Sequence, residues 1–156
     1  MNVTIELATV EHLAEYYPVF DDSALYDHYF KGTDILREWL DEPVKLGHVY
    51  VALTSKREPV GIMHMTMDGF SGLPYLNLLG VKKQYRGMGI GHKFLKLFID
   101  VCEKSGAPNM FIFTSMFNVR SAALYQSVGF KKIGIIPNFM KKGVDEIAFV
   151  RPNSKI

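Results

Sequence analysis

Residues 76–104 read LNLLGVKKQYRGMGIGHKFLKLFIDVCEK, and this stretch decides the fold. An apolar extended segment meets three closely spaced glycines, Gly87, Gly89 and Gly91, and passes directly into an amphipathic helix. Glycines at such a junction let the backbone approach a ligand closely, while the first N–H groups of the helix and the positive end of its dipole face that ligand. The stretch therefore predicts a main-chain cradle for a phosphate.

The spacing of the glycines separates the known kinds of phosphate-binding loop. A dinucleotide fingerprint, GxGxxG, would need a glycine at His92 and an acidic residue at the right distance beyond it, and neither is present. A P-loop would need GxxxxGK followed by Ser or Thr, whereas Gly87 is followed five positions later by His92 and Lys93. What remains is QxxGxG, with Gln84, Gly87 and Gly89 at its fixed positions.

A second motif lies downstream in the segment NVRSAALYQSVGF, residues 118–130. Asn118 begins it, a helix carries Tyr125 seven positions later, and Gly129 with Phe130 closes it. A helix and the apolar strand MFIFTS separate the two motifs, and the helical crossover predicts that this strand runs parallel to the one before the glycine loop. The two motifs, in this order, resemble the GNAT N-acetyltransferases over roughly residues 48–151. The C-terminal half is most similar to the ribosomal-protein N-terminal-alanine acetyltransferases of that superfamily.

The resemblance implies acetyl-CoA as the acetyl-donor cosubstrate and no metal. In this family the loop amides hold the diphosphate, and main-chain groups of the preceding strand align the pantetheine and polarise the acetyl carbonyl. Asn118 would hydrogen-bond the pantetheine arm, and Tyr125, the catalytic candidate, would donate a proton to the departing thiolate. The cofactor-binding residues implied are Leu79, Gly80, Val81, Gln84, Arg86, Gly87, Met88, Gly89, Ile90, Gly91, His92, Asn118 and Tyr125.

The general base, which takes a proton from the attacking amine, is where the resemblance is incomplete. The ribosomal-protein acetyltransferases carry a glutamate on the strand before the asparagine, and the matching position here is Phe113. Deprotonation through water to Asp68, His64 or Tyr75 stays open, and an amine that arrives neutral would need no base.

The acceptor amine is not fixed by the motifs, and a small amine, a polyamine, a protein N-terminus and a lysine all stay open. Paired tyrosines grip a peptide in the last loop of the ribosomal-protein enzymes, where this chain has Phe139 and Met140. The resemblance places the acceptor between the N-terminal helices and the loops 70–76 and 136–144. Residues there that could hold a cationic amine between acids and aromatic faces are Asp21, Asp22, Tyr26, Asp27, Tyr29, Trp39 and Phe70. The alternative function is a CoA-binding sensor or interaction module without turnover.

Length and composition limit the remaining possibilities. A chain of 156 residues fits one GNAT domain, 1–156, and a net charge of +2 is too small to argue for nucleic acid. Basic residues gather only around the glycine loop, at Lys82, Lys83, Arg86, Lys93 and Lys96. The single cysteine, Cys102, excludes an internal disulfide, and the five histidines lack metal-binding spacing. Without a signal peptide or an 18-residue apolar run, we expect a cytoplasmic protein that does not bind membranes. Family members are often dimers, so a homodimer is compatible with the resemblance.

Apolar periodicity predicts alternating helices and strands with a mixed central sheet. The resemblance implies the α/β (α+β) GNAT acyl-CoA N-acyltransferase fold, in which about six to seven strands are flanked by helices. Thr9 is expected to cap the first helix, and Gly32 to separate two short helices, the second capped by Thr33. The stretches expected to be strands are 3–7, 48–55, 59–69, 74–81, 110–115, 130–137 and 145–152, the last two flanking a polar loop at 138–144.

Overall fold

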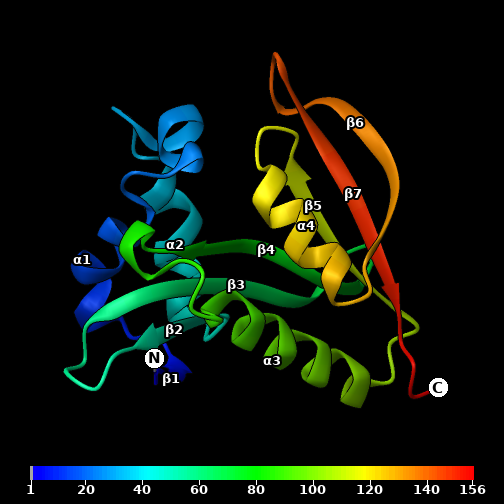
Figure 1. The fold of residues 1–156 in the computed structure, drawn as a ribbon, viewed down its shortest axis with the longest axis horizontal. Helices are drawn as coiled ribbons and strands as arrows, with labels where there is room; N and C mark the ends of the chain where they lie inside the picture. Colours follow the sequence, from blue (N-terminus) through cyan, green and yellow to red (C-terminus); the bar gives the residue numbers. More distant parts are fainter. Residues whose placement is uncertain (1) are drawn as a thin grey trace. The chain divides into compact units, whose positions relative to one another are not determined.

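The computed structural model describes residues 2–156 and contains one seven-stranded mixed sheet (Figure 1). In sheet order the strands are β1 (Thr4–Leu7), β2 (Val49–Leu53), β3 (Pro59–Phe70), β4 (Leu73–Val81), β5 (Asn109–Ser115), β7 (Val144–Pro152) and β6 (Lys131–Lys141). The β4–β5 pair is parallel, whereas β1–β2, β2–β3, β5–β7 and β6–β7 are antiparallel. The mixed sheet predicted from the sequence, including its parallel central pair, is confirmed.

The chain forms two compact units. The first runs as far as His64 and resumes over Leu78–Phe94, and the second comprises Met65–Asn77 and Leu95–Ile156. Three elements, β3, β4 and the helix α3 (Ile90–Ser105), pass from one unit into the other. The organisation of the whole chain as one GNAT domain stays a prediction.

The N-terminal helices of the first unit are short and irregular. They are η1 (Val10–His12), α1 (Leu13–Tyr16), η2 (Tyr17–Phe20), the π-helix η3 (Tyr26–Phe30) and α2 (Ile35–Lys45). The predicted break at Gly32 is confirmed, since its φ of 71° is in the left-handed region that favours glycine. Thr9 is the N-cap residue at the start of this segment, but the segment begins as a 3₁₀ turn and the Thr9 side chain makes no capping hydrogen bond.

The second capping prediction needs correction. Asp34, not Thr33, is the N-cap of α2, although the Thr33 hydroxyl accepts a hydrogen bond from the Ile35 amide at 3.3 Å. The same hydroxyl donates to the carbonyl of Phe30 at 3.0 Å, so Thr33 joins the end of η3 to the start of α2. The helix α2 then continues past Pro43 to Lys45.

In the second unit, β6 and β7 form a long hairpin beside the helix α4 (Val119–Ser127), as Figure 1 shows. Most of the polar loop expected at 138–144 is strand, because β6 continues to Lys141. Asn138 explains the difference. The main-chain N–H of Asn138 donates to Asp145 Oδ1 at 3.1 Å, and the side-chain Oδ1 of Asn138 accepts from the main-chain N–H of Gly143 at 2.6 Å. These two bonds close the hairpin end.

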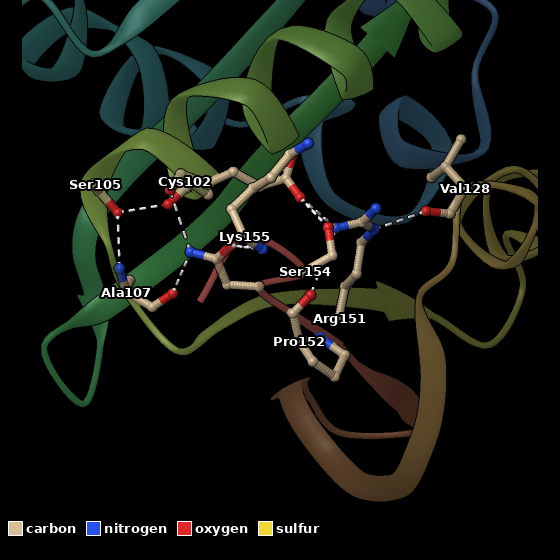
Figure 2. Close-up of polar contacts among 10 residues, drawn as sticks. Cys102, Ser105, Ala107, Val128, Arg151, Pro152, Ser154 and Lys155 are labelled. Carbon is tan, nitrogen blue, oxygen red and sulfur yellow. Dashed lines mark hydrogen bonds and ion pairs between the residues drawn. The ribbon is translucent and has the colours of Figure 1, made fainter.

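The C-terminal residues of the second unit are fastened to the end of α3 (Figure 2). The Asn153 side chain is 5% exposed and donates to the carbonyls of Glu103 at 3.2 Å and Ala107 at 2.8 Å. Arg151 donates to the Val128 carbonyl at 3.0 Å and pairs with the Glu103 carboxylate at 3.5 Å. These bonds add to the one that the Gly106 amide donates to the Glu103 carbonyl at 3.4 Å, and so reinforce the end of α3.

The sulfur-containing side chains differ in burial. Cys102 is fully buried, and burial raises the pKa of its thiol to about 12. The alternating methionines of β3 share one strand face. Met63 and Met65 are buried, but Met67 is 36% exposed, since the strand has left the packed core by that residue. Within residues 2–156, no helix is both long and apolar enough to cross a membrane.

Candidate functional site

The glycine loop lies in the first unit, between the end of β4 and the start of α3. A 3₁₀ turn, η4 (Lys83–Tyr85), leads into Gly87 and Gly89, whose φ angles of 77° and 85° favour glycine. A Cβ added to Gly89 would meet no atom within 4 Å, so the space in front of the loop is open. Ile90, which is 2% exposed, then anchors the first turn of the 16-residue helix. The loop therefore combines left-handed glycines with a helix N-terminus.

Glu58, a residue that the sequence reasoning missed, holds the loop from the neighbouring hairpin. Its carboxylate accepts from Lys82 Nζ at 3.2 Å and from the Tyr85 hydroxyl at 3.1 Å, and these bonds lower its pKa. The Lys82 amide also donates to the Val60 carbonyl at 2.9 Å. Lys82 of the predicted basic cluster is thus committed to Glu58. No local motif could reveal this, because the partners are 24 and 27 positions apart.

The strand end before the loop is fixed by packing. Leu79, Gly80 and Val81 are half-buried, and a Cβ at Gly80 would lie 2.3 Å from the Phe20 ring. Gly80 is therefore required by a close contact within the unit. Arg86 Nε donates to the Val81 carbonyl at 3.1 Å, which ties the loop to the strand that precedes it.

The remaining loop residues form an open surface. Gln84, Met88 and His92 are exposed, Met88 to 47%, while Gly91 is half-buried inside the first turn of α3. These side chains leave the loop backbone accessible.

Tyr125 lies in the second unit, where α4 buries it to 4% exposure. Its ring packs edge-on against Phe130 and Phe149, with centroids 6.5 and 6.0 Å away. Burial raises the pKa of the phenol, against the opposing effect of a hydrogen bond from Ser121. The hydroxyl thus keeps its proton at neutral pH, which suits a donor rather than a base.

Asn118 precedes α4 as its N-cap residue, yet its side chain makes no capping hydrogen bond. Asparagine at this position ordinarily accepts a hydrogen bond from an amide in the first turn. Here the main chain alone holds the turn, since the Asn118 amide donates to the Ser115 carbonyl at 2.9 Å and its carbonyl accepts from Ala122 at 3.2 Å. The side-chain amide remains half-buried beside the helix start, which is compatible with the ligand role implied by the family resemblance.

The three base candidates lie in different environments. Burial, helped by the nearby His48, lowers the pKa of His64 to about 4, so its imidazole is neutral but a weak base. Burial, and then the charge of Glu146, raise the pKa of Tyr75 to about 12. Asp68 is exposed on the last part of β3.

Phe113 is at the position where the resemblance to the ribosomal-protein acetyltransferases would imply a glutamate. It lies within a group of five rings in the second unit that we call the aromatic cluster. The cluster consists of Phe70, Tyr75, Phe111, Phe113 and Phe139. The centroid of the Phe113 ring lies 5.2 Å from that of Phe70, 5.3 Å from that of Tyr75 and 5.4 Å from that of Phe139. Beside the cluster on β7 is Glu146, a buried carboxylate that the sequence reasoning also missed. Its place within a mostly apolar strand indicates burial but reveals no role.

The residues expected to hold the acceptor come from both units. Tyr29 and Trp39 pack together in the first unit with centroids 5.7 Å apart, and Phe30 contacts Trp39 edge-on at 5.4 Å. These rings belong to the helix packing of that unit, whereas Phe70 belongs to the aromatic cluster of the second. Asp21, Asp22 and Asp27 are exposed, and Tyr26 is half-buried. Across residues 2–156, no three His, Cys, Asp or Glu side chains are grouped so as to hold a metal ion.

Comparison with known proteins identifies the family of the chain. The family model described as Acetyltransferase (GNAT) family matches residues 7–130. N-alpha-acetyltransferase 30 of Schizosaccharomyces pombe is 26% identical over 76 residues, which are 49% of this chain and 51% of that protein. N-alpha-acetyltransferase 50 of Danio rerio is 33% identical over 69 residues, 44% of this chain and 41% of that protein. The chain thus spans about half the length of the curated relatives it matches, or less.

Solved structures agree in fold. A GNAT-family acetyltransferase from Bacillus cereus ATCC 10987 has a TM-score of 0.78 at 18% identity, covering 98% of this chain and 99% of that one. The ribosomal-protein-S18-alanine N-acetyltransferase of Escherichia coli has a TM-score of 0.73 at 20% identity, covering 98% and 95%. The NatC complex bound to Gag peptide and CoA has a chain with a TM-score of 0.73 at 19% identity, covering 97% and 99%. The fold predicted from the two motifs is confirmed.

Proposed function

The chain belongs to the GNAT acetyltransferase family, and we propose that it is an acetyl-CoA-dependent N-acetyltransferase that transfers the acetyl group directly to a primary amine. The observation that carries the proposal is the glycine loop, with Gly87 and Gly89 in the left-handed region and open space before α3. The curated relatives are named N-alpha-acetyltransferases, and the NatC structure holds CoA, which supports the same donor here.

Backbone amides from Gly87 to His92 would bind the diphosphate of CoA. Several amides at a helix N-terminus can donate to one anion at once, and the helix dipole adds to the attraction. Lys83 and Lys93 are exposed beside the loop and would add attraction without a fixed contact. Glu58 contributes indirectly by holding Lys82 and Tyr85, which shape the turn before the loop.

The transfer itself would use groups from both motifs, as the family resemblance implies. A neutral amine attacks the thioester carbon, the carbonyl oxygen becomes negatively charged, and main-chain groups of Leu79–Val81 would stabilise that charge. The amine nitrogen then loses a proton and the thiolate gains one. Tyr125, whose hydroxyl keeps its proton at neutral pH, would donate to the thiolate.

A protein N-terminus is supported as an acceptor by the names of the relatives, and small amines, polyamines and lysine remain candidates. Phe139 and Met140, which stand where the ribosomal-protein enzymes have paired tyrosines, are 43% and 53% exposed near the end of β6. They would offer an acceptor apolar contact but no phenolic hydroxyl.

A CoA-binding sensor or interaction module is the second candidate function. The observations that favour it are Phe113, at the position of a glutamate in the ribosomal-protein acetyltransferases, and the burial of Tyr125. Such a protein would bind CoA through the same loop and release no thiol.

One pair of measurements separates these functions. We expect calorimetry to detect binding of acetyl-CoA, and a thiol-release assay to detect turnover with at least one member of a panel of N-terminal peptides, lysine, spermidine and small amines. Binding without thiol release from any acceptor would favour the sensor. Absence of binding would refute both candidates, since each depends on the loop.

A further inference from the structure

Glu146 is an unusual side chain for the middle of a strand. It is 7% exposed and the only buried acidic side chain among residues 2–156. On β7 it lies opposite Ser115 of β5 on one side and Ile136 of β6 on the other. Its Oε2 atom is buried and has no hydrogen-bond partner within the described chain. A buried carboxylate with an unsatisfied oxygen destabilises a fold, so its presence calls for a compensating role.

The register places Glu146 on the same face of the sheet as the aromatic cluster. Residues directly opposite in an antiparallel pair share a face, so Glu146 lies with Ser115, and Ala148 lies with Phe113. Phe113 is therefore a diagonal neighbour of Glu146, at a separation that aromatic side chains bridge. Tyr125, in contrast, contacts Phe149, whose side chain alternates to the other face.

The other groups around Glu146 leave it short of positive charge. The Ser115 hydroxyl donates to the carboxylate, which partly offsets a rise in its pKa caused by burial. From β4, Tyr75 is close enough for the charge of Glu146 to raise the phenol's pKa. Ile136 of β6 is apolar, and Asp145, next along β7, is engaged by the Asn138 amide at 3.1 Å. Burial and the Ser115 bond are the two influences on the Glu146 pKa, and neither is a cation.

An organic ammonium group would supply what this site lacks. Its charge would pair with the carboxylate, and the neighbouring ring faces would attract it further. The rim of the cluster is accessible, since Phe70 is 37% and Phe139 43% exposed. We propose that Glu146, beside the aromatic cluster, binds the ammonium group of the acceptor and accepts its proton before acetyl transfer. The inference rests on the proposed function.

The proton balance of this step is simple. The N–H bond of the ammonium breaks, its proton moves to the Glu146 carboxylate, and the freed electron pair attacks the thioester carbon. After attack, the amine nitrogen loses a second proton while the departing thiolate gains one. Glu146 then releases its proton to water. A carboxylate whose pKa is raised toward the working pH is a better base than an ordinary surface glutamate.

The test compares wild type with Glu146→Gln, which keeps the shape of the side chain and removes the base. Thiol release is measured from pH 6 to pH 10 with the best acceptor of a panel containing phenethylamine, spermidine and a peptide with a free N-terminus. We expect kcat/KM of the variant to fall by about 10²-fold or more at pH 7. The deficit should shrink as pH rises past the pKa of the amine, because a neutral amine needs no base.

Two comparisons make the result specific. A weakly basic acceptor, 2,2,2-trifluoroethylamine, is largely neutral at pH 7 and should show a smaller deficit with Glu146→Gln, while Glu146→Asp should keep part of the wild-type rate. Glu42→Gln is the matched control, since Glu42 is exposed on α2 and pairs only loosely with Lys45 at 3.9 Å. That control should match wild type.

The outcomes distinguish the two proposals. Equal rates in wild type and Glu146→Gln, or a deficit independent of both pH and amine basicity, would overturn the role of Glu146 and leave the acetyltransferase proposal intact. If the wild-type protein releases no thiol with any of the acceptors tested, the proposed function is overturned, and the proton transfer to Glu146 is overturned with it. Thermal unfolding gives a separate reading. Removal of a costly buried charge should leave Tm at pH 7 equal or raised, and a clear fall in Tm would indicate a structural glutamate instead.

Discussion

The glycine loop and the aromatic cluster handle charge in opposite ways. At the loop, the carboxylate of Glu58 is exposed to solvent and satisfied by Lys82 and Tyr85, and the backbone faces open space. At the cluster, the carboxylate of Glu146 is buried and one of its oxygens lacks a hydrogen-bond partner within residues 2–156. We propose that the first region binds an anion with main-chain groups and that the second attracts a cation with side chains.

The difference teaches which changes each region tolerates. Main-chain recognition depends on φ angles, so most loop side chains can vary while the glycines cannot. Side-chain recognition depends on individual atoms, so one substitution can remove the chemistry without changing the backbone. Changes at the loop should therefore act on acetyl-CoA affinity, and changes near the cluster or Tyr125 on turnover.

Gly89→Asp should have the largest effect on binding. An aspartate there would strain the backbone at a φ of 85° and place a negative charge where the diphosphate is proposed to bind. We expect acetyl-CoA affinity, measured by calorimetry, to fall by about 10²-fold or more. Gly47→Asp is the matched control, because Gly47 has a φ of 75° and equally open surroundings away from the loop. If both variants bind like wild type, the loop is not the diphosphate site.

Tyr125→Phe should act on turnover alone. Loss of the hydroxyl removes the proposed proton donor, and kcat should fall by about 10²-fold while acetyl-CoA affinity stays within twofold of wild type. Stopped-flow or steady-state thiol release measures the first quantity and calorimetry the second. Tyr50→Phe, a half-buried tyrosine of β2, serves as the control. An unchanged kcat would remove Tyr125 from the mechanism and leave it as a packing residue.

Tyr85→Phe should have a smaller effect, again on affinity. It removes the hydroxyl that donates to Glu58 at 3.1 Å, a hydrogen bond whose loss costs about 1 kcal/mol at most, or roughly fivefold in Kd if all of it is transmitted to the ligand. In the double variant Tyr85→Phe/Glu58→Gln, the loss of acetyl-CoA affinity should not exceed the sum of the losses in the two single variants, because both substitutions weaken the contact between Tyr85 and Glu58. Altered kcat at unchanged affinity would contradict the separation of the two regions.

The smallest expected effect is on stability, and it has opposite signs in the two units. Burial lowers the pKa of His64 to about 4, below the ordinary value near 6.5, so stability present above pH 6.5 is lost as pH falls toward 4. His64→Gln should lose less Tm than wild type between pH 7 and pH 4. The pKa of Glu146 is raised, so its charged form destabilises the fold as pH rises, and the advantage of Glu146→Gln should grow with pH.

Thermal unfolding at several pH values measures both trends, with His12→Gln as a control at an exposed histidine. If plots of Tm against pH are parallel for wild type, His64→Gln and Glu146→Gln, burial shifts the pKa of neither His64 nor Glu146 as inferred.

Much of the fold follows from local pattern. The β4–loop–α3 segment was predictable because glycine spacing, apolar periodicity and the parallel crossover constrain each other. The continuation of β6 through Asn138 was not predictable, because it depends on hydrogen bonds with Gly143 and Asp145. Polar composition alone predicts a loop there. For Thr9, the residue type indicated the N-cap position but not that the turn would be 3₁₀ and that the side chain would make no capping bond.

The candidate site divides in the same way. Gln84, Gly87 and Gly89 were identifiable since a fixed backbone geometry requires fixed spacing. Glu58 and Glu146 were not, because their importance comes from partners on other strands and, for Glu146, from an oxygen left without one. Roles that depend on which strands become neighbours are invisible to a motif.

The attachment of Asn153 to α3 has a consequence for the order in which the chain can fold during synthesis. Its side-chain amide binds the Glu103 carbonyl, fifty positions earlier, so this connection to the end of the helix cannot form on the ribosome until residue 153 has emerged. The first unit, in contrast, is complete in sequence at Phe94. Nascent chains stalled before residue 153 should therefore present a second unit that proteases cut readily, while the unit with the glycine loop already resists them.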